Sequence, residues 1–444
     1  MIFDGCRGFL CKWMIIVMIA GVAIRMAISP LLTYNYDFYS WALIISNMQA
    51  GCGLYDVAGY NYPPVWGYFL GILAQFTDLF GIDVLAERFP ELIYTESSTT
   101  FFPHSAYVTT LEFSVAITAM LTVFDVLISF VIYWFVKDTF GDEPKALACA
   151  AVWMLCPFVI VIVSVGGMFD GISGLMTLLC VMLLIKEREL LAGMVFSAAV
   201  LLKLFPGFLL FIFLAYIIAK HRGNRPMRRV AMLVIGGILM TAVIMLPNVL
   251  SGHLMDSLSF ITSRATTPSE DYGALMQIGP IVTYVAILIL EIVLAVIFLR
   301  REHRDLDRSF LFATFVSAML IFVYPSTPQY VLFVAPLLIV VAFCMDGRYR
   351  IPLYLLMVGT TIFTLSSWSV DLTGLAAYTD LMTFDQLDAL YAWSENRILG
   401  WNMSDITSIV GGTIQYIATS LALLTILKTL LMKKGESETD GLHQ

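Results

Sequence analysis

The sequence places a carboxylate and an ammonium group beside long apolar segments, where an isolated charge is costly. Asp37 follows the first apolar segment, within the aromatic-rich residues 34–41, and Lys203 interrupts a later one. A carboxylate can act as a general base towards a hydroxyl group. An ammonium group in an apolar setting requires an anionic partner or a watery site. The alternatives are that Asp37 caps a helix and that Lys203 forms an internal ion pair with Asp125 or Glu291.

Aromatic residues after the first apolar segment have the chemistry of a sugar-binding surface. Tyr36, Trp41 and Tyr62 offer ring faces on which sugars stack, although Tyr and Trp also gather at membrane interfaces. Tyr62 precedes Pro63 and Pro64, which fix an extended turn. We therefore expect these three aromatic side chains to line a substrate site, with an interfacial belt or a rigid loop as the alternatives.

Two further charged residues are candidates for substrate contacts. Asp170, between Phe169 and Gly171, can hydrogen-bond a substrate or satisfy the backbone of a turn. Arg264 lies just beyond an apolar segment, and its planar guanidinium suits a phosphate or a carboxylate. The alternative for Arg264 is an isolated surface arginine.

Signatures of bound cofactors are absent from the sequence. The five histidines show no metal-ligand spacing, and neither a Walker loop nor a dinucleotide-binding fingerprint occurs. We therefore expect no cofactor, and a divalent cation held by carboxylates such as Asp37 and Asp170 stays open. We expect no nucleic-acid partner, because the charges are sorted by side of a membrane.

The composition requires a lipid environment. Hydrophobic residues make up 59% of the 444 residues, charged residues make up 13%, and the mean hydropathy is +0.86. So few charges cannot cover a globule of this size in water. A spanning helix needs roughly 20 apolar residues, which predicts an all-α polytopic bundle of about twelve spans. They lie near Lys12–Pro30, Leu111–Val136, Ala146–Val163, Met168–Ile185, Leu190–Leu202, Phe205–Ala219, Val230–Val249, Ile278–Leu299, Ser309–Tyr324, Tyr330–Met345, Ile351–Ser369 and Ile406–Met432.

The basic residues support this layout and give its orientation. Short cytoplasmic loops collect Lys and Arg, and with these spans most of the 25 basic residues fall on one side, together with both chain ends. The five exceptions, within the membrane or outside it, are Arg25, Arg88, Lys203, Arg264 and Arg397.

One transmembrane domain, residues 1–432, accounts for the chain up to a solvated cytoplasmic tail at 433–444. We expect the first segment to be a signal anchor that is retained. Two exterior stretches are long, residues 31–110 and 370–405. Within the first, Val65–Ile82 is predicted to be an amphipathic juxtamembrane helix at the interface, because counting it as a span would invert every later basic cluster.

Three short hairpins are expected to turn on the exterior side. The apolar run from Leu190 to Ala219 would be roughly 45 Å long as a helix, too long for one span of about 30 Å and too short for two. It must therefore turn, at residues 203–207. Two similar Gly- or Pro-rich turns lie at residues 166–171 and 325–329. Broken helices at membrane depth line a cavity, so we expect one recess open to the exterior.

These residues resemble the GT-C superfamily of membrane glycosyltransferases, which use polyprenyl-phosphate-linked sugars. The likeness is nearest to the first GPI mannosyltransferase and to the glucosyltransferases of the asparagine-linked pathway. Asp37 matches an acidic residue in an aromatic setting after the first helix, and Tyr62-Pro63-Pro64 matches a segment before a juxtamembrane helix. Residues 203–206 and 326–330 are similar to the family's Lys-containing and Pro-Gln-Tyr turns, with Thr327 where a His is often found.

The resemblance implies transfer of a hexose, with mannose expected, from a polyprenyl or dolichyl phosphate donor to a lipid-linked or membrane-proximal acceptor. Asp37 would act as the base of an inverting displacement, and Lys203 and Arg264 would bind the donor phosphate. Gln329 and Tyr330 join the aromatic residues and Asp170 as substrate-binding candidates. In a prokaryotic cell membrane, the site would face the exterior.

Two other classes of function remain open from the sequence. A secondary transporter or lipid-linked sugar flippase also uses broken helices and intramembrane charges. No pseudo-symmetric pair of interrupted segments is evident, and all three turns lie on one side. A non-catalytic assembly subunit is the third reading. Release of lipid phosphate from a sugar donor distinguishes the transferase from both.

Overall fold

The chain folds as an all-helical bundle in a computed structural model that describes residues 9–33, 35–56, 60, 62–85, 109–258, 274–322, 328–367, 372–394 and 396–431. In these ranges the regular structure is helical, and the only strand-like pairs are the isolated bridges Leu85–Thr109 and Ile398–Trp401. The predicted all-α class is therefore confirmed. The tail at 433–444 lies outside the described ranges, and the division into one domain and a tail stays a prediction.

The first half of the described chain forms ten helices and two short irregular ones. They are α1 (Phe9–Ile28), α2 (Asn35–Gln49), α3 (Pro64–Leu79), α4 (Leu111–Phe140), α5 (Glu143–Leu155), α6 (Pro157–Val159), the π-helical η1 (Ile160–Val165), α7 (Asp170–Ile185), α8 (Glu189–Leu202), the 3-10 helix η2 (Phe205–Leu209), α9 (Leu210–Lys220) and α10 (Pro226–Leu250).

The second half continues in the same way. Its elements are α12 (Ala274–Arg300), α13 (Leu306–Phe322), η3 (Pro328–Tyr330), α14 (Val331–Val340), η4 (Val341–Met345), η5 (Gly347–Tyr349), α15 (Arg350–Ser367), α16 (Thr373–Tyr378), α17 (Phe384–Ser394) and α18 (Met403–Leu431).

Several of these helices have the length and apolar composition of membrane spans. Five qualify within the described residues: α4, α10, most of α12, the segment Pro328–Met345, and α18. A sixth forms if α5 and the segment Pro157–Val165, bent by 43°, are one span. Helical structure occupies each of the twelve ranges predicted from the sequence, and that all twelve cross the membrane stays a prediction.

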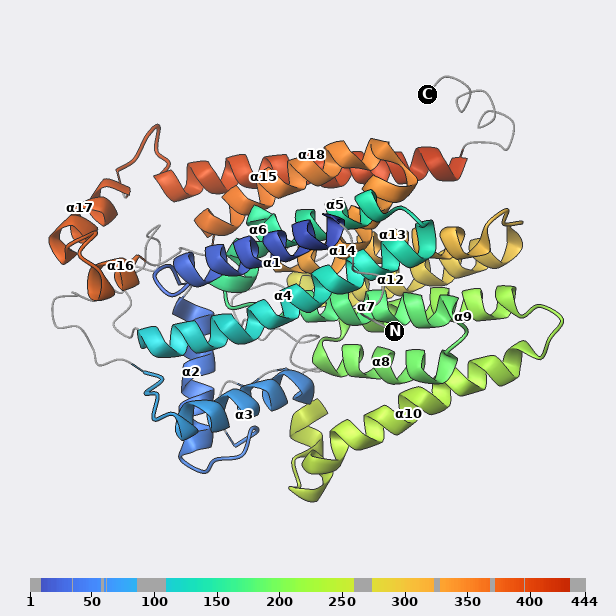
Figure 1. Ribbon diagram of the computed structural model, residues 1–444, viewed down its shortest axis with the longest axis horizontal. Helices are drawn as coiled ribbons and strands as arrows, with labels where there is room; N and C mark the ends of the chain where they lie inside the picture. The colour runs from blue at the N-terminus through green and yellow to red at the C-terminus, as the bar shows by residue number, and fades with distance from the viewer. Residues whose placement is uncertain are drawn as a thin grey trace.

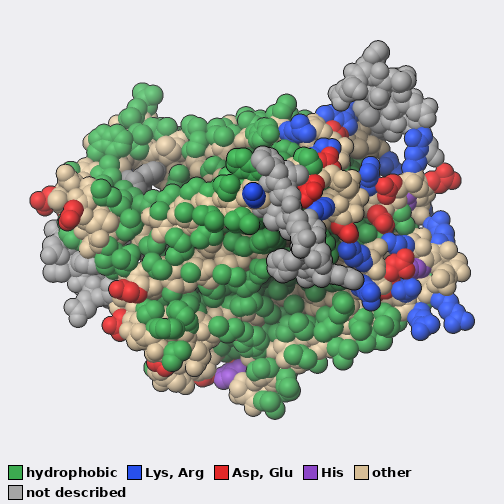
Figure 2. Space-filling model, in the orientation of Figure 1, with side chains coloured by type: hydrophobic (Ala, Val, Ile, Leu, Met, Phe, Trp, Pro, Cys, Tyr) green, Lys and Arg blue, Asp and Glu red, His purple; other side chains and the backbone are tan. Residues whose placement is uncertain are grey.

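The long helices run along one direction, and α2 runs across it (Figure 1). The helices α16 and α17 lie at the same end of the bundle as α2, whereas the turn from α9 to α10 lies at the opposite end. On the face shown in Figure 2, Lys and Arg side chains gather at this opposite end. The fold therefore agrees with the charge sorting on which the predicted orientation rests.

Glycines allow the close approach of two helix pairs. A Cβ atom added to Gly193 of α8 would lie 1.9 Å from the carbonyl oxygen of Leu233 in α10, and one added to Gly411 of α18 would lie 2.4 Å from the backbone nitrogen of Phe363 in α15. Small residues at such contacts let helix backbones meet, as is common in membrane bundles.

The predicted juxtamembrane segment is largely helical. Its helix, α3, begins directly after Pro63, which has an extended backbone, and has Pro64 in the first helical position. The side chains of Ile72, Phe76 and Leu79 are exposed. An apolar exposed face fits contact with lipid, and the interfacial placement of α3 stays a prediction.

Candidate active site

The turn between α8 and α9 carries Lys203 into the interior of the bundle. Helix α8 ends at Leu202, the backbone of Lys203 is extended (φ −154°, ψ 138°), and the 3-10 helix η2 follows with Pro206 in its first turn. The Lys203 side chain lies almost wholly inside the protein, with the residue 7% exposed. The predicted hairpin within Leu190–Ala219 is confirmed.

Asp170 is the ionic partner of this lysine. The Nζ atom of Lys203 donates a hydrogen bond to Oδ1 of Asp170, and the carboxylate is only 1% exposed. Asp170 is the first residue of α7 and follows a turn in which Gly167 has a φ of 67°, a conformation that favours glycine. Two of the three predicted turns therefore meet in one buried ion pair.

Three aromatic rings, including that of Tyr330 directly after the third predicted turn, lie around the same lysine. The Nζ atom of Lys203 lies 4.9 Å from the ring centroid of Tyr330, 5.3 Å from that of Phe169 and 5.9 Å from that of Phe205. Tyr330 belongs to η3, which follows residues 323–327, a segment outside the described part of the chain. Rings at this distance attract an ammonium group, so the structure gathers residues of two predicted turns, and the residue that follows the third, around one cation.

Asp37 faces this group of charges from the first turn of α2. The residue is 6% exposed, and its carboxylate accepts no hydrogen bond from the described residues, so a capping role has no support there. Burial is the main reason that the pKa of Asp37 is raised to about 7. The nearby Lys203 ammonium lowers this pKa, and the Asp170 carboxylate raises it further. A carboxyl group with this pKa can exchange a proton near neutral pH.

The ring of Phe169 joins the first exterior segment to the turn before α7. It stacks on Trp66, with centroids 4.4 Å apart and planes 12° apart, and it packs edge-on against Tyr62 at 5.3 Å and Trp41 at 6.1 Å. The indole Nε1 of Trp41 donates a hydrogen bond of 3.1 Å to the carbonyl oxygen of Gly167. These contacts hold α2 and α3 against the Asp170 turn.

A second set of contacts fixes the Tyr-Pro-Pro segment. The hydroxyl of Tyr60 donates a 2.8 Å hydrogen bond to the carbonyl oxygen of Pro63, and its ring packs against Tyr55 and Tyr62. Tyr62 also packs against Trp41, with centroids 5.6 Å apart. Tyr62 is therefore a half-buried member of the aromatic cluster beside Asp37.

The remaining candidates have separate positions. Gln329 lies in η3 next to Tyr330 and is partly exposed. Tyr36 lies in α2, but its side chain is outside the described part of the structure. Arg264 lies in residues 259–273, also outside it. The structure brings together Asp37, Trp41, Tyr62, Asp170, Lys203 and Tyr330.

The alternative partners considered for Lys203 are wrong. Asp125 accepts a hydrogen bond from Nε of Arg25 at 2.9 Å, in a pair that is almost completely buried. Glu291 accepts a hydrogen bond from the hydroxyl of Ser317 at 2.5 Å. Neither the position in the sequence nor the expected side of the membrane distinguishes these acids from Asp170. The packing of α7 against α8 determines which acid meets Lys203.

Sequence reasoning missed the central position of Phe169 and Trp66. Phe169 directly precedes Asp170, and Trp66 lies two residues after Pro64, so an aromatic residue beside each of these positions was the available signal. For a metal, the described residues contain no group of three His, Cys, Asp or Glu side chains that could hold one.

Comparison with known proteins adds an independent observation. The sequence model of glycosyltransferase family 87 matches residues 99–326, just over half of the chain. The matched range contains Asp170 and Lys203, and Asp37 precedes it. No curated protein matches the chain.

The helical membrane fold and this match together define a membrane glycosyltransferase. The chain belongs to glycosyltransferase family 87.

Proposed function

We propose that this glycosyltransferase moves a hexose, mannose in the first instance, from a polyprenyl or dolichyl phosphate to a lipid-linked or membrane-proximal acceptor. The observation that carries the proposal is the approach of a buried carboxyl, Asp37, to the Lys203–Asp170 ion pair, inside a chain of family 87. One group can take a proton and the other can hold a phosphate, which are the two requirements of transfer from a phosphate-linked sugar.

Asp37 is the proposed general base. The acceptor hydroxyl attacks the anomeric carbon of the donor sugar and gives its proton to the carboxylate of Asp37. The new bond joins the acceptor oxygen to the anomeric carbon, and the bond between that carbon and the phosphate oxygen breaks with its electron pair. A single displacement inverts the anomeric centre and needs no nucleotide or cofactor.

Lys203 is the proposed binding group for the donor phosphate, with Arg264 as a second cation. The leaving phosphate gains negative charge, and a fixed ammonium group in a buried site stabilises that charge. In the structure the ammonium is held by Asp170 and faces the ring of Tyr330. An arriving phosphate would therefore share Lys203 with Asp170 or take its place.

The aromatic cluster is the proposed sugar surface. Trp41 and Tyr62 lie in contact beside the Asp170 turn, and Tyr36, Gln329 and Tyr330 complete the candidate set with Asp170. Ring faces suit the apolar faces of a hexose. We place this site on the extracytoplasmic side of a cell membrane, because it is formed by turns opposite to the basic loops.

A release assay tests the reaction class. Purified protein is incubated with polyprenyl-phosphate mannose or glucose and a membrane lipid extract as acceptor, and free polyprenyl phosphate is measured. Transfer predicts phosphate release that depends on both donor and extract. A flippase would move the labelled donor across a vesicle bilayer without release, and an assembly subunit would do neither. Either of those results would refute the proposal.

A further inference from the structure

A polar groove opens between α8 and α10 at the basic end of the bundle. Its volume is about 490 Å³. The lining comes from the starts of the two helices and the loops before them: Glu187, Arg188, Glu189, Leu190, Leu191, Asn224, Arg225, Arg228, Arg229 and Met232. This end is opposite to the candidate active site, so the groove requires its own explanation.

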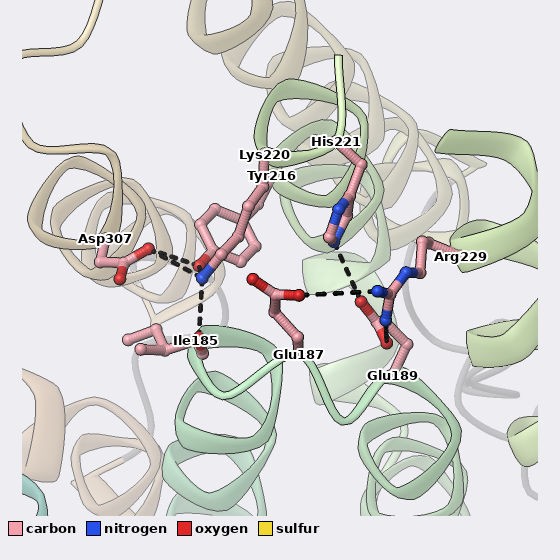
Figure 3. Close-up of polar contacts among 8 residues, drawn as sticks. All are labelled: Ile185, Glu187, Glu189, Tyr216, Lys220, His221, Arg229 and Asp307. Atoms are coloured by element: carbon pink, nitrogen blue, oxygen red, sulfur yellow. Dashed lines mark hydrogen bonds and ion pairs between the residues drawn. The ribbon is translucent and has the colours of Figure 1, made fainter. Parts of the chain in front are cut away.

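The two acidic residues of the groove share one arginine at its inner wall (Figure 3). Glu189 contacts Nε2 of His221 at 3.1 Å and accepts a 3.0 Å hydrogen bond from Nη1 of Arg229. The carboxylate of Glu187 lies 3.6 Å from Nη2 of the same arginine. Both glutamates therefore face Arg229, and the four arginines and two glutamates of the lining leave the groove with a net charge of +2.

Three arginines of the groove carry a positive charge that no described acidic residue pairs with. Arg188, Arg225 and Arg228 are exposed and form no ion pair with any residue that the structure describes. A guanidinium group presents a fork of donors that matches the oxygens of a phosphate. Three of them around one groove favour an anionic ligand.

The other side of the groove is apolar and continues into the membrane-facing surface. Leu191 and Met232 line the groove and are themselves exposed. Further along α10, Ile235, Ile238 and Leu239 are exposed on the same helix. A ligand with a phosphate at one end and a hydrocarbon chain at the other would satisfy both parts.

The two walls of the groove are held at a fixed separation. Added Cβ atoms on Gly193 and Gly236 would lie 1.9 Å and 2.0 Å from the carbonyl oxygens of Leu233 and Leu190, so α8 and α10 touch backbone to backbone one turn or so below the arginines. The groove is therefore a built feature of the helix pair and does not depend on side-chain placement alone.

We propose that this groove binds the phosphate headgroup of an anionic glycerophospholipid, with an acyl chain along the outer surface of α8 and α10. Arg188, Arg225 and Arg228 hold the phosphate, and Leu191 and Met232 contact the start of the chain. Basic clusters at the ends of membrane helices attract anionic lipid headgroups by about 1 kcal/mol for each Lys or Arg. The site is independent of the transfer reaction.

Native mass spectrometry of the full-length protein in neutral detergent tests the proposal. Phosphatidylglycerol and phosphatidylcholine are titrated separately, and the wild type is expected to bind the former more tightly. The double variant Arg188→Gln/Arg228→Gln should bind phosphatidylglycerol about 30-fold more weakly, because it lacks two of the headgroup cations. Each single variant should lose about fivefold, which preserves the test if the double variant does not fold.

The matched control removes two arginines from the same end but outside the groove. Arg222→Gln/Arg300→Gln should leave binding within about twofold, and Arg188→Lys/Arg228→Lys should retain most of it. Equal losses in the two Gln doubles would show a non-specific charge effect and overturn the proposal. Unchanged binding in the groove variants would also overturn it. So would displacement of the lipid by an equal concentration of inorganic phosphate, which would identify a free-phosphate site.

Discussion

Lys203 and Asp170 form a buried ion pair at the point where α7 begins and α8 ends. Breaking such a pair by removing one partner leaves an uncompensated buried charge. The pair therefore holds an ammonium group in an interior site even without a ligand. Under the proposed function, a donor phosphate would find that cation already positioned.

The role of Lys203 is separated from its structural pairing by a double variant. Lys203→Met alone should destabilise the protein by about 3–5 kcal/mol, because Asp170 stays buried without a counterion. Lys203→Met/Asp170→Leu should recover most of that stability, yet its KM for the donor should stay raised at least about tenfold, the value of a charged hydrogen bond. Thermal unfolding and initial rates measure the two effects. A KM that returns to the wild-type value would limit Lys203 to a structural role.

The pH dependence of transfer follows from the raised pKa of Asp37. Because the pKa is about 7, the carboxyl is protonated and inactive as a base below that pH and ionised above it. The kcat/KM should rise through about pH 7 and level off at higher pH. Asp170→Asn removes a negative charge that raises this pKa, so the rising limb should move to lower pH. A flat profile, or a shift to higher pH in that variant, would contradict the assignment.

The buried pair Arg25–Asp125 ties α1 to α4. The Nη1 atom of Arg25 also donates to the carbonyl oxygen of Met154 in α5 at 2.6 Å. Arg25→Met should lower stability by about 3–5 kcal/mol, because Asp125 loses its counterion. Arg25→Met/Asp125→Leu should be markedly more stable than the single variant. Equal stabilities of the single and double variants in detergent unfolding would show that the pair is not coupled.

The contact between α8 and α10 has a built-in control. Gly193→Ala places a Cβ 1.9 Å from a backbone oxygen, whereas a Cβ on Gly237 would lie 3.7 Å from the nearest atom, the carbonyl oxygen of Gly193. The first substitution should destabilise by about 1–3 kcal/mol or more, through overpacking. Gly237→Ala should change stability little. Similar falls in Tm for both variants would mean that the helix pair is looser than the structure shows.

Composition and charge sorting predicted the helical ranges well, because apolar length and the positive-inside rule act locally along the chain. The turns at 166–171 and 203–207 were also predictable from their Gly and Pro residues, since these break helices, whereas most of the predicted turn at 325–329 lies outside the described residues. The ionic partner of Lys203 could not be predicted, because Asp170, Asp125 and Glu291 all lie in apolar stretches of the sequence. Only the packing of the helices decides which of these acids meets the lysine. The stacking of Phe169 on Trp66 likewise joins segments more than a hundred residues apart, and no local pattern encodes it.

The arginine groove could not be predicted from the sequence either, because it depends on how the helices pack. Charge alone places the basic residues of 186–188 and 220–229 on one side of the membrane. The contacts of Glu187 and Glu189 determine which of these arginines has an ionic partner. The close approach of α8 and α10 depends on Gly193 and Gly236. Neither relationship produces a periodic pattern in the sequence.

The most direct test of the central claim is the Asp37→Asn variant, measured for donor binding and for release of polyprenyl phosphate in the same preparation. This variant should fold, bind the donor within about twofold of the wild type and release lipid phosphate at least about 100-fold more slowly, the range that a general base supplies. Release at the wild-type rate would show that Asp37 is not the base.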